Sequence, residues 1–502
     1  MKAELAVTKI DLLADLPGFR DFYPMDWWKI DYVLTNMRNV AKRYGYEEYE
    51  GPSVEALELI EAKSGPSLMG EVFSFKDKRQ RRLLLRPEQT PTLARMLAKQ
   101  QQRYKRPIRW FAIPRLFRDE TTQKGREREF WQLNVDILGE SDLVSDAEVM
   151  AVGIDILREC GIEDDRFVVY VNNRKFLSSV IKDNTTIKVQ SVIRIIDKKA
   201  ALTQSYVFDK LKENGEDEKT ATSLSLLFRR IVNSTQEFKD QLLIDCPDHV
   251  KAHVENIGRI EERVMINAFT ELGIESQSAH KIFEITKISG PPIDFVAKMK
   301  ALDLNKISLE LLQEFEKLGT HLKSMKVDQP VIFDASLARG LDYYTGFVFE
   351  IFDATGELVR ALLGGGRYDN LIEVIGGQPL SGTGFGMGDV TTLQMINIHS
   401  KFPDTIQREI DFYLAPINQK TKNDILELAS RIRNNFIIVC NAFKWKLGRH
   451  FELADSLKAK FVLLLGPKDV ETKQISVRNM VSSEQFQIEL DDHLEENLRS
   501  LL

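Results

Sequence analysis

Four glycines at alternate positions place the strongest constraint on how this 502-residue chain folds. They are Gly382, Gly384, Gly386 and Gly388, separated by Thr, Phe and Met. Successive side chains of a strand point to opposite faces, so these positions leave one face bare. Another chain segment or a flat ligand must then approach the backbone closely. Asp389 follows, where the N-cap of a helix is expected.

A second strand is expected to carry polar groups on one face. Within Trp131–Ile137, Gln132, Asn134 and Asp136 alternate with Leu, Val and Ile. The period of two predicts that the apolar residues pack on a core while the polar residues offer donors and a carboxylate. A simple solvated sheet face is the alternative interpretation.

This strand belongs to a predicted antiparallel hairpin whose strands are Ile108–Phe117 and Arg126–Ile137. The connecting segment is rich in cations, with Arg118, Lys124, Arg126 and Arg128. Clustered guanidinium groups suit a polyanion, because their planar fork matches phosphate oxygens. A loop of exposed charges is the alternative.

Two further segments combine polar and small residues at predicted strand ends. Arg339-Gly-Leu-Asp-Tyr343-Tyr344 places a cation, a carboxylate and two phenols within six residues, and Gly364–Asp369 reads Gly-Gly-Gly-Arg-Tyr-Asp. Loops at strand ends often hold functional groups. Without further context a polar turn with half-buried tyrosines is equally compatible.

Composition excludes several classes of protein. The chain has 69 Lys and Arg residues and 75 Asp and Glu residues, which gives a net charge of −6. This mild acidity argues against a non-specific nucleic-acid coat, although local basic clusters still permit RNA binding. Cys160, Cys246 and Cys440 are far apart, so neither cysteine nor histidine predicts a metal site. No apolar stretch is long enough for a membrane helix, and no signal peptide or P-loop is found. We therefore expect a cytoplasmic protein with no membrane partner.

Periodicity outlines the organisation of the chain. Trp27–Arg43 is predicted as an amphipathic helix, with apolar residues at helical spacing. Helical periodicity dominates residues 185–325. After Pro403, strands and helices alternate, at Phe412–Leu414, Lys422–Asn434, Phe436–Val439, Gly448–Ala459 and Phe461–Leu465, as in a small α/β domain with a parallel or mixed sheet.

Taken together, these motifs resemble the histidyl-tRNA synthetase family of class II aminoacyl-tRNA synthetases. The resemblance covers nearly the whole chain, from Leu16 onward. It rests on Leu85–Thr90, Phe117–Gln132, Arg339–Tyr344, Gly364–Asp369 and the C-terminal segments Lys446–Gly448, Ala454–Asp455 and Phe461–Gly466. It implies an α+β fold, in which an antiparallel-sheet catalytic core with a helical insertion precedes an α/β anticodon-binding domain. The implied divisions are 1–184 (core), 185–325 (insertion), 326–402 (core) and 403–502 (anticodon-binding).

The resemblance also implies an activity. Histidine and ATP, accompanied by Mg²⁺, would form histidyl-adenylate, and the histidyl group would then pass to the 3′ end of tRNA(His). A homodimer built on the Trp27–Pro52 region is implied too. The attacking carboxylate and the triphosphate are both anions, so fixed cations are needed in such a site.

Roles for the ATP site carry over by position. Arg118 would hold the α-phosphate and Phe130 would stack on adenine, with Arg126 and Gly388 also contacting ATP. Arg339 would stabilise the charge that develops on the α-phosphate during attack.

Roles in binding histidine and tRNA carry over in the same way. Glu88, Thr90 and Gln132 would bind the α-amino and carboxylate groups of histidine. Asp136, Tyr343 and Tyr344 would surround the imidazole, because a neutral imidazole offers one donor and one acceptor that a carboxylate and a phenol can meet. Gln123 and Lys124 would contact the tRNA acceptor end.

One position departs from the class II pattern. The third class II motif normally carries an arginine that covers the adenine ring, but Thr391 stands there and no arginine follows nearby. This departure keeps a second hypothesis open, that of a catalytically silent relative that regulates histidine biosynthesis or senses uncharged tRNA. A class II synthetase of threonyl, prolyl or glycyl type is a third alternative, opposed by both histidine-specific motifs.

Overall fold

The computed structural model describes residues 14–61, 69–123, 125–213, 215, 217–233, 257–338, 343–403, 410–443 and 446–502. The chain divides into two compact units, Met1–Lys401 and Phe402–Leu502. The boundaries expected within the first unit, at residues 185 and 326, stay predictions. Among the described residues, no helix is both long and apolar enough to cross a membrane.

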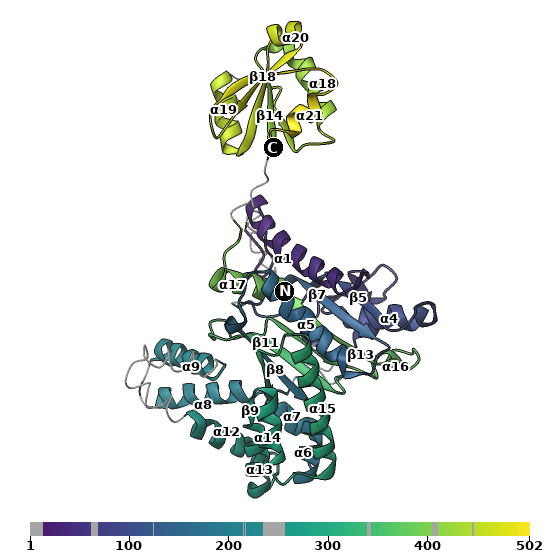
Figure 1. The fold of residues 1–502 in the computed structure, drawn as a ribbon. Helices are drawn as coiled ribbons and strands as arrows, with labels where there is room; N and C mark the ends of the chain where they lie inside the picture. Colours follow the sequence, from purple (N-terminus) through teal and green to yellow (C-terminus); the bar gives the residue numbers. More distant parts are fainter. Residues whose placement is uncertain are drawn as a thin grey trace, which may run out of the picture. The chain divides into compact units, whose positions relative to one another are not determined.

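A ten-stranded sheet organises the first unit (Figure 1). Its strand order is β1-β5-β7-β13-β12-β11-β8-β10-β9, and β6 pairs with β7 outside this path. From β7 through β13, β12 and β11 to β8, each strand is antiparallel to the next, whereas β8 and β10 are parallel. The bounds are β1 Glu47–Glu48, β5 Ile108–Ala112, β6 Arg115–Phe117, β7 Glu129–Leu138, β8 Phe167–Asn173, β9 Ser289–Gly290, β10 Val331–Asp334, β11 Phe347–Asp353, β12 Leu363–Arg367 and β13 Gly382–Gly388.

The predicted hairpin is present, with one correction. The run expected as one strand, Ile108–Phe117, is split into β5 and β6, and both pair antiparallel with β7. Pro114 lies in the break, and proline has no backbone N–H for a sheet ladder. Its carbonyl instead accepts a hydrogen bond from Gln132 N at 3.1 Å.

Helices α1 (Pro24–Arg43) and α5 (Leu143–Glu159) cover one face of the sheet, with α5 packed on β13, β7 and β12. The amphipathic helix predicted at Trp27–Arg43 is confirmed as α1. Its apolar positions are at most 7% exposed: Ile30, Val33, Leu34, Met37 and Val40. Their spacing of three and four residues places them on one stripe, which burial stabilises.

The N-terminal part of the chain also forms a smaller sheet and two helices. A three-stranded sheet of order β2-β4-β3 joins Val54–Ala56, Arg82–Leu85 and Ser74–Lys76. The short helix α2 (Leu57–Glu61) packs on it, and α4 (Thr90–Gln100) follows β4 after a brief turn. In the strand predicted at Leu83–Leu85, Leu84 is fully buried.

The described residues between 174 and 324 are mainly helical, as predicted for 185–325, and residues 234–256 lie outside the described part of the chain. The helices are α6 Arg174–Asn184, α7 Val189–Asp197, α8 Lys199–Glu213, α9 Glu218–Asn233, α12 Ile257–Glu271, α13 Ser276–Thr286, α14 Pro292–Lys300 and α15 Lys306–Ser324. One core cluster joins α6, α7, α12 and α13. Phe315 of α15 instead contacts the rings of Phe333 and Phe347, on β10 and β11.

The end of β11 is tied to α17 (Asp389–His399) through a buried carboxylate. Asp353 is fully buried and accepts hydrogen bonds from Leu358 N at 2.9 Å and from Thr355 N at 2.9 Å. His399 Nε2 lies 2.9 Å from the same carboxylate. Burial opposes ionisation of this group, but the hydrogen bonds outweigh burial and lower the pKa of Asp353. The helix α16 (Leu371–Val374) lies between β12 and β13 in the chain.

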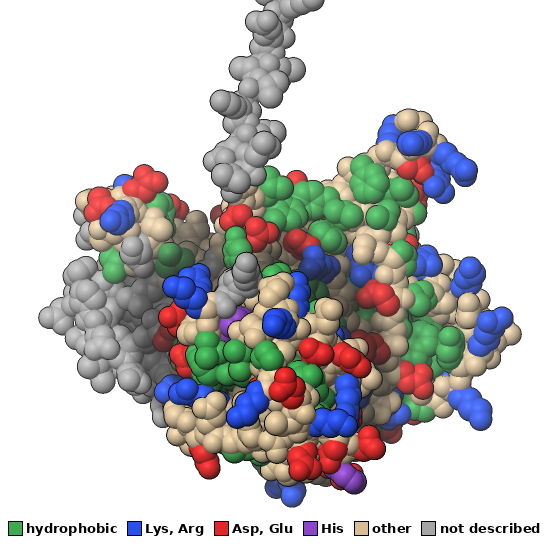
Figure 2. Space-filling view, turned by 90° about the horizontal axis from the view of Figure 1, so that it is seen from above, with side chains coloured by type: hydrophobic (Ala, Val, Ile, Leu, Met, Phe, Trp, Pro, Cys, Tyr) green, Lys and Arg blue, Asp and Glu red, His purple; other side chains and the backbone are tan. Residues whose placement is uncertain are grey.

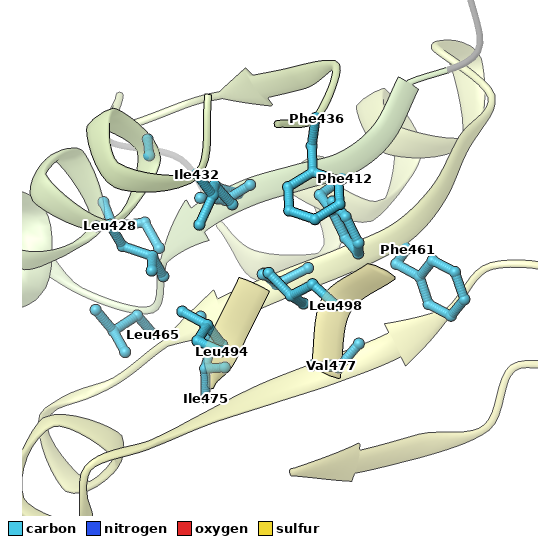
Figure 3. Packing of buried hydrophobic residues seen from close by; sticks show 14 residues of the cluster. Phe412, Leu428, Ile432, Phe436, Phe461, Leu465, Ile475, Val477, Leu494 and Leu498 are labelled. Atoms are coloured by element: carbon cyan, nitrogen blue, oxygen red, sulfur yellow. The ribbon is translucent and has the colours of Figure 1, made fainter. Parts of the chain in front are cut away.

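The second unit is an α/β domain, as predicted. In its sheet, β15-β14-β16-β17-β18, the first three strands are parallel and the last two antiparallel, which makes the sheet mixed. Its apolar core contains Phe412, Leu428, Phe461 and Leu498 (Figure 3). The bounds are β14 Ile410–Pro416, α18 Lys422–Ile432, β15 Ile438–Cys440, α19 Leu447–Ser456, β16 Ala459–Leu465, α20 Pro467–Thr472, β17 Gln474–Asn479, β18 Gln485–Glu489 and α21 Leu494–Arg499.

Basic and acidic side chains are interspersed on the face shown in Figure 2, where no single sign of charge dominates. This distribution agrees with the small net charge of −6. Recognition of a charged ligand on this face would therefore depend on local arrangements of side chains.

Candidate active site

Two adjoining cavities lie over the sheet. The Asp136 cavity is lined by Glu88, Thr90, Arg118, Gln132, Asn134, Asp136, Tyr343, Tyr344, Gly364, Tyr368, Gly384, Phe385 and Gly386. The Thr391 cavity, of about 530 Å³, is lined by Arg118, Glu120, Gly125–Glu127, Phe130, Gln132, Asp197, Glu350, Phe352, Val359–Gly364, Gly386, Gly388, Val390 and Thr391. Arg118, Gln132, Gly364 and Gly386 line both. Most residues that the sequence singled out are thus brought together.

The predicted division of β7 into two faces is confirmed. Gln132, Asn134 and Asp136 line the Asp136 cavity. The intervening residues Leu133 and Val135 are fully buried. They belong to the face on which α5 packs, because successive residues of a strand point to opposite sides. The solvated-face alternative is wrong.

The glycines of β13 make room for another chain segment, which answers the question left open by their spacing. A Cβ at Gly384 would lie 2.3 Å from Asp136 Oδ1 and 2.4 Å from Val135 O. A Cβ at Gly386 would lie 2.5 Å from Gln132 Nε2. Absent side chains on β13 therefore let the polar groups of β7 lie flat over the neighbouring strand and face the cavity.

The Asp136 carboxylate is oriented by Tyr368, whose hydroxyl donates a hydrogen bond to Asp136 Oδ1. Tyr368 is 2% exposed, and burial together with the Asp136 carboxylate raises its pKa well above the usual value. The phenol therefore stays protonated and remains a donor. Tyr368 stands in the quoted Gly-Gly-Gly-Arg-Tyr-Asp motif, but no role had been predicted for it. The motif alone does not show that Tyr368 binds Asp136.

Three tyrosines form one wall of the Asp136 cavity. The ring centroids of Tyr343 and Tyr344 are 4.6 Å apart, and those of Tyr343 and Tyr368 are 6.1 Å apart. Tyr344 is 6% exposed. Asp136 and Tyr344, the two residues expected to face an imidazole, therefore line a single small space.

The segment after β4 supplies a further carboxylate and a hydroxyl to the Asp136 cavity. Glu88 is buried, and Thr90 is the first residue of α4. Arg86 fixes this turn, because its Nη1 donates to Glu50 Oε1 at 2.8 Å and to Gly51 O at 2.7 Å. A carboxylate, a hydroxyl and the amide of Gln132 can together bind an ammonium and a carboxylate group.

Arg118 stands where the two cavities meet. Its Nε donates to Pro87 O at 3.0 Å, and its guanidinium carbon lies 5.2 Å from the centroid of the Phe130 ring. Glu120, which is buried, forms an ion pair with Arg126 and lies 3.7 Å from Arg118 Nη1. One buried carboxylate thus holds two guanidinium groups at the edge of the Thr391 cavity, ready to meet phosphate oxygens.

The remaining predicted residues are placed less completely. Gly388 lines the Thr391 cavity. Gln123 is exposed, and its backbone forms an isolated antiparallel β-bridge with Arg126 in the hairpin loop. Arg339 and Lys124 lie outside the described residues, so their predicted roles stay predictions.

The N-cap predicted at Asp389 is wrong by one residue. Gly388 is the N-cap of α17, and Asp389 is its first helical residue. The Asp389 carboxylate accepts hydrogen bonds from Trp131 N at 3.0 Å and from Arg20 Nη2 at 2.8 Å. These tertiary contacts tie the helix to β7 and to the N-terminal segment. Burial raises the pKa of Asp389, while Arg20 opposes the shift.

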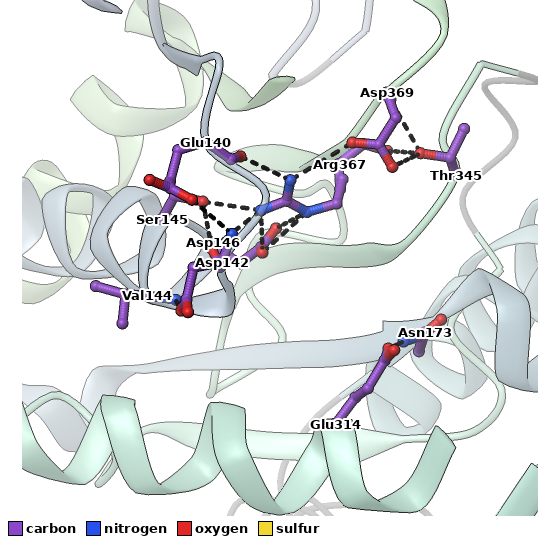
Figure 4. Close-up of polar contacts among 10 residues, drawn as sticks. All are labelled: Glu140, Asp142, Val144, Ser145, Asp146, Asn173, Glu314, Thr345, Arg367 and Asp369. Atoms are coloured by element: carbon purple, nitrogen blue, oxygen red, sulfur yellow. Dashed lines mark hydrogen bonds and ion pairs between the residues drawn. The ribbon is translucent and has the colours of Figure 1, made fainter. Parts of the chain in front are cut away.

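Arg367, in the Gly364–Asp369 motif, lines neither cavity. It forms a buried network (Figure 4). Its Nε lies 3.0 Å from Asp146 Oδ2, and its Nη2 donates to Ser145 Oγ at 2.8 Å. Asp369 accepts a hydrogen bond from Thr345 Oγ1 at 2.9 Å. The network joins the end of β12 to the start of α5 and to the segment after Tyr344, so it positions the tyrosine wall.

The core sheet, its paired cavities and the separate C-terminal α/β unit define a class II aminoacyl-tRNA synthetase. Comparisons with known proteins agree. A family model described as Histidyl-tRNA synthetase matches residues 18–261 and 262–391, and one described as Anticodon binding domain matches residues 411–500. The chain belongs to the histidyl-tRNA synthetase family.

Individual relatives extend over almost the whole chain. It is 31% identical over 484 residues to a protein of Leptospira biflexa named histidine–tRNA ligase, covering 95% of each chain. A protein of the same name from Haloarcula marismortui is 30% identical, with 94% of this chain and 95% of that one covered. The solved histidyl-tRNA synthetase of Nostoc shares the fold, with a TM-score of 0.70, 22% identity, and coverage of 98% and 99%.

Proposed function

We propose that this chain is an ATP-dependent histidine–tRNA ligase that uses the two adjoining cavities as one active site. The observation that carries the proposal is their junction at Arg118 and Gln132, which line both. An amino acid in the Asp136 cavity and ATP in the Thr391 cavity would meet there. The α-carboxylate and the α-phosphate, the two groups that must react, then share one pair of side chains.

Histidine is recognised at the inner end of the Asp136 cavity. Asp136 accepts from one imidazole nitrogen and Tyr344 serves the other, while Tyr343 completes the wall. Glu88, Thr90 and Gln132 bind the α-amino and carboxylate groups. A side chain without these ring nitrogens would leave buried polar groups unpaired, which strongly disfavours its binding.

ATP occupies the Thr391 cavity, with adenine on Phe130 and the α-phosphate on Arg118. Arg126 and the backbone at Gly388 make further contacts. A histidine carboxylate oxygen forms a bond to the α-phosphorus while the bond to the pyrophosphate oxygen breaks. Fixed guanidinium groups lower the repulsion between the two anions and stabilise the charge that develops. Arg339 is proposed to act on the same phosphate.

In the second step, an oxygen of the tRNA 3′-terminal ribose forms a bond to the histidyl carbonyl carbon, and AMP leaves. Gln123 and Lys124, in the hairpin loop, are proposed to contact the acceptor end. The second unit, which matches the anticodon-binding family, would contact the other end of tRNA(His).

The residues present fit Mg²⁺ carried by ATP. Within the described part of the chain, no three His, Cys, Asp or Glu are grouped to hold a metal ion by themselves. Mg²⁺ is usually bound by one or two carboxylates together with substrate phosphates. Glu350 and Asp197 line the Thr391 cavity and could contribute such oxygens. Bound Mg²⁺ would neutralise charge on the pyrophosphate leaving group.

A homodimer built on the Trp27–Pro52 region is part of the proposal. Tyr23, Met25 and Trp27, at the start of α1, are 72%, 54% and 41% exposed, and such apolar exposure favours association. Light scattering after size exclusion would give twice the chain mass. Location in the cytoplasm is likewise proposed, and cell fractionation tests it.

The deciding experiment is ATP–pyrophosphate exchange with each common amino acid in the absence of tRNA. We expect exchange with histidine alone. Asp136→Asn should raise the KM for histidine about 10- to 100-fold, because a charged hydrogen-bond acceptor is lost. Asp303→Asn, the same change at an exposed aspartate outside both cavities, is the matched control and should leave this KM unchanged. Folded protein that supports no exchange, or exchange with another amino acid, would refute the proposal.

A further inference from the structure

The cations of the Thr391 cavity include one that no quoted motif contains. Among the described residues, Arg118, Arg126 and Arg360 line it. Arg360 comes from the connection between β11 and β12, four residues before the Gly-Gly-Gly-Arg-Tyr-Asp motif begins. Arg118 and Arg126 are both arranged around the buried carboxylate of Glu120.

Sheet register explains why Arg360 reaches this place. In the antiparallel pair β12 and β13, Leu363 lies opposite Met387. The segment that enters β12 therefore lies beside the segment that leaves β13, and residues 360–362 are neighbours of residues 388–391. A direct contact follows the same pattern, because Thr391 Oγ1 donates to Leu362 O at 3.4 Å.

The side chains of Arg360 and Thr391 flank the same point of the hairpin loop. A Cβ built on Gly125 would lie 3.4 Å from Thr391 Cγ2 and 3.5 Å from Arg360 Cδ. Arg360 is partly buried. A guanidinium from position 360 thus lies next to the position from which the expected arginine is missing.

Charge in the cavity makes this cation important. The three arginines stand against four carboxylates, those of Glu120, Glu127, Asp197 and Glu350. Without Arg360, two guanidinium groups that already share Glu120 would remain to bind a polyanionic nucleotide. An excess of carboxylates over guanidinium groups in the cavity weakens the binding of an anionic nucleotide.

We infer that Arg360 is an ATP-binding residue that takes the place of the arginine absent at position 391. This inference rests on the proposed use of the cavity for ATP. A guanidinium is planar, always charged, and stacks on aromatic rings, so it suits both the adenine ring and the phosphates. Phe130, in the same cavity, would supply the second surface for adenine.

The first test is equilibrium titration of the full chain with Mg·ATP by calorimetry, without histidine or tRNA. Arg360→Ala should weaken ATP binding about tenfold, because a stacked, charged contact is lost. Arg360→Lys should lie between that variant and the parent, since an ammonium keeps the charge and loses the planar surface. The KM for histidine in exchange assays should stay unchanged. Arg103→Ala, at an exposed arginine outside both cavities, is the control.

The second test moves the cation. Thr391→Arg added to Arg360→Ala should restore ATP binding to within about threefold of the parent, given that the two positions serve one site. Arg360→Ala that binds ATP as the parent does would overturn the inference. A folded double variant that binds no better than Arg360→Ala would overturn the equivalence of the two positions. Parent protein that binds ATP without histidine-dependent exchange would refute the ligase function alone, so the two failures are distinguishable.

Discussion

Arg367 and Asp146 form a buried ion pair, and removing Arg367 alone should cost the first unit a large part of its stability. The side chains are 6% and 1% exposed. Arg367 Nε lies 3.1 Å and 3.0 Å from the two Asp146 oxygens, and Nη2 lies 2.5 Å from Oδ2. Further donations reach Glu140 O at 3.0 Å and Ser145 Oγ at 2.8 Å. Nearly every donor of this guanidinium is thus used inside the protein.

Arg367→Met keeps the approximate length of the side chain and removes its charge. Asp146 would then be a buried carboxylate without its counter-ion, and breaking such a pair costs about 3–5 kcal/mol. This is a large fraction of the 5–15 kcal/mol that stabilises a typical domain. Replacing both partners, as in Arg367→Met with Asp146→Leu, should recover much of the loss, because no buried charge remains.

The cost should depend on pH in a defined direction. Burial already raises the pKa of Asp146, and Arg367 opposes this shift. Without Arg367, the folded pKa of Asp146 rises further above its unfolded value. A carboxyl with a raised folded pKa favours the folded state at low pH and loses this effect as pH increases. The variant should therefore lose up to about 1.4 kcal/mol of stability per pH unit as the pH rises from the unfolded pKa of Asp146 to its raised folded pKa, with no further loss above that value.

Urea unfolding followed by tryptophan fluorescence is a suitable assay. Trp27, Trp28, Trp110 and Trp131 lie in the first unit, so four of five tryptophans report on it. A cost below about 1 kcal/mol for Arg367→Met at pH 7 would refute the reasoning, since that value is typical of an exposed pair. So would a double variant as unstable as the single one, because the penalty would then not come from an unpaired charge.

Three other perturbations test the site and the fold. Gly384→Ala should cost about 1–3 kcal/mol or more in thermal unfolding, because its Cβ would lie 2.3 Å from Asp136 Oδ1, whereas Gly448→Ala, with open space around it, should be tolerated. Tyr368→Phe should raise the KM for histidine about tenfold and leave the KM for ATP unchanged, because Asp136 loses the donor that orients it. Asp353→Asn should cost about 1–3 kcal/mol at pH 7. Burial opposes ionisation of Asp353, but hydrogen bonds outweigh it and lower its folded pKa, so the difference from the parent should shrink as the pH falls below 3.8, which urea unfolding from pH 7 to pH 3 measures.

Local periodicity was enough to predict much of the fold. The stripe of α1, the two faces of β7 and the alternation of strands and helices after residue 403 all follow from which neighbours along the chain share a face. One error had a local cause and the other a tertiary one. Pro114 divided an expected strand, and Trp131 N recruited the Asp389 carboxylate that had been expected to cap α17.

The site was harder to predict, because its geometry depends on partners that are distant in sequence. Tyr368 and Asp136 are separated by 232 positions, and the sequence contains no sign that they are bonded. The bare face of β13 indicated a close approach, yet whether a ligand or a chain segment approached could be decided only once β13 was seen beside β7. Residue types were therefore predictable, and their pairings were not.

The arginine expected at position 391 also shows that partners distant in sequence are hard to predict. Thr391 is followed by the rest of α17, where no arginine lies nearby in the sequence. The antiparallel register instead makes residues 360–362 the neighbours of that position, 29 to 31 residues earlier in the chain. A ligand contacts a surface and not a sequence position, so a cation supplied from either strand end can serve the same nucleotide. A departure from a motif is therefore evidence of lost function only after the spatial neighbours of the altered residue have been searched.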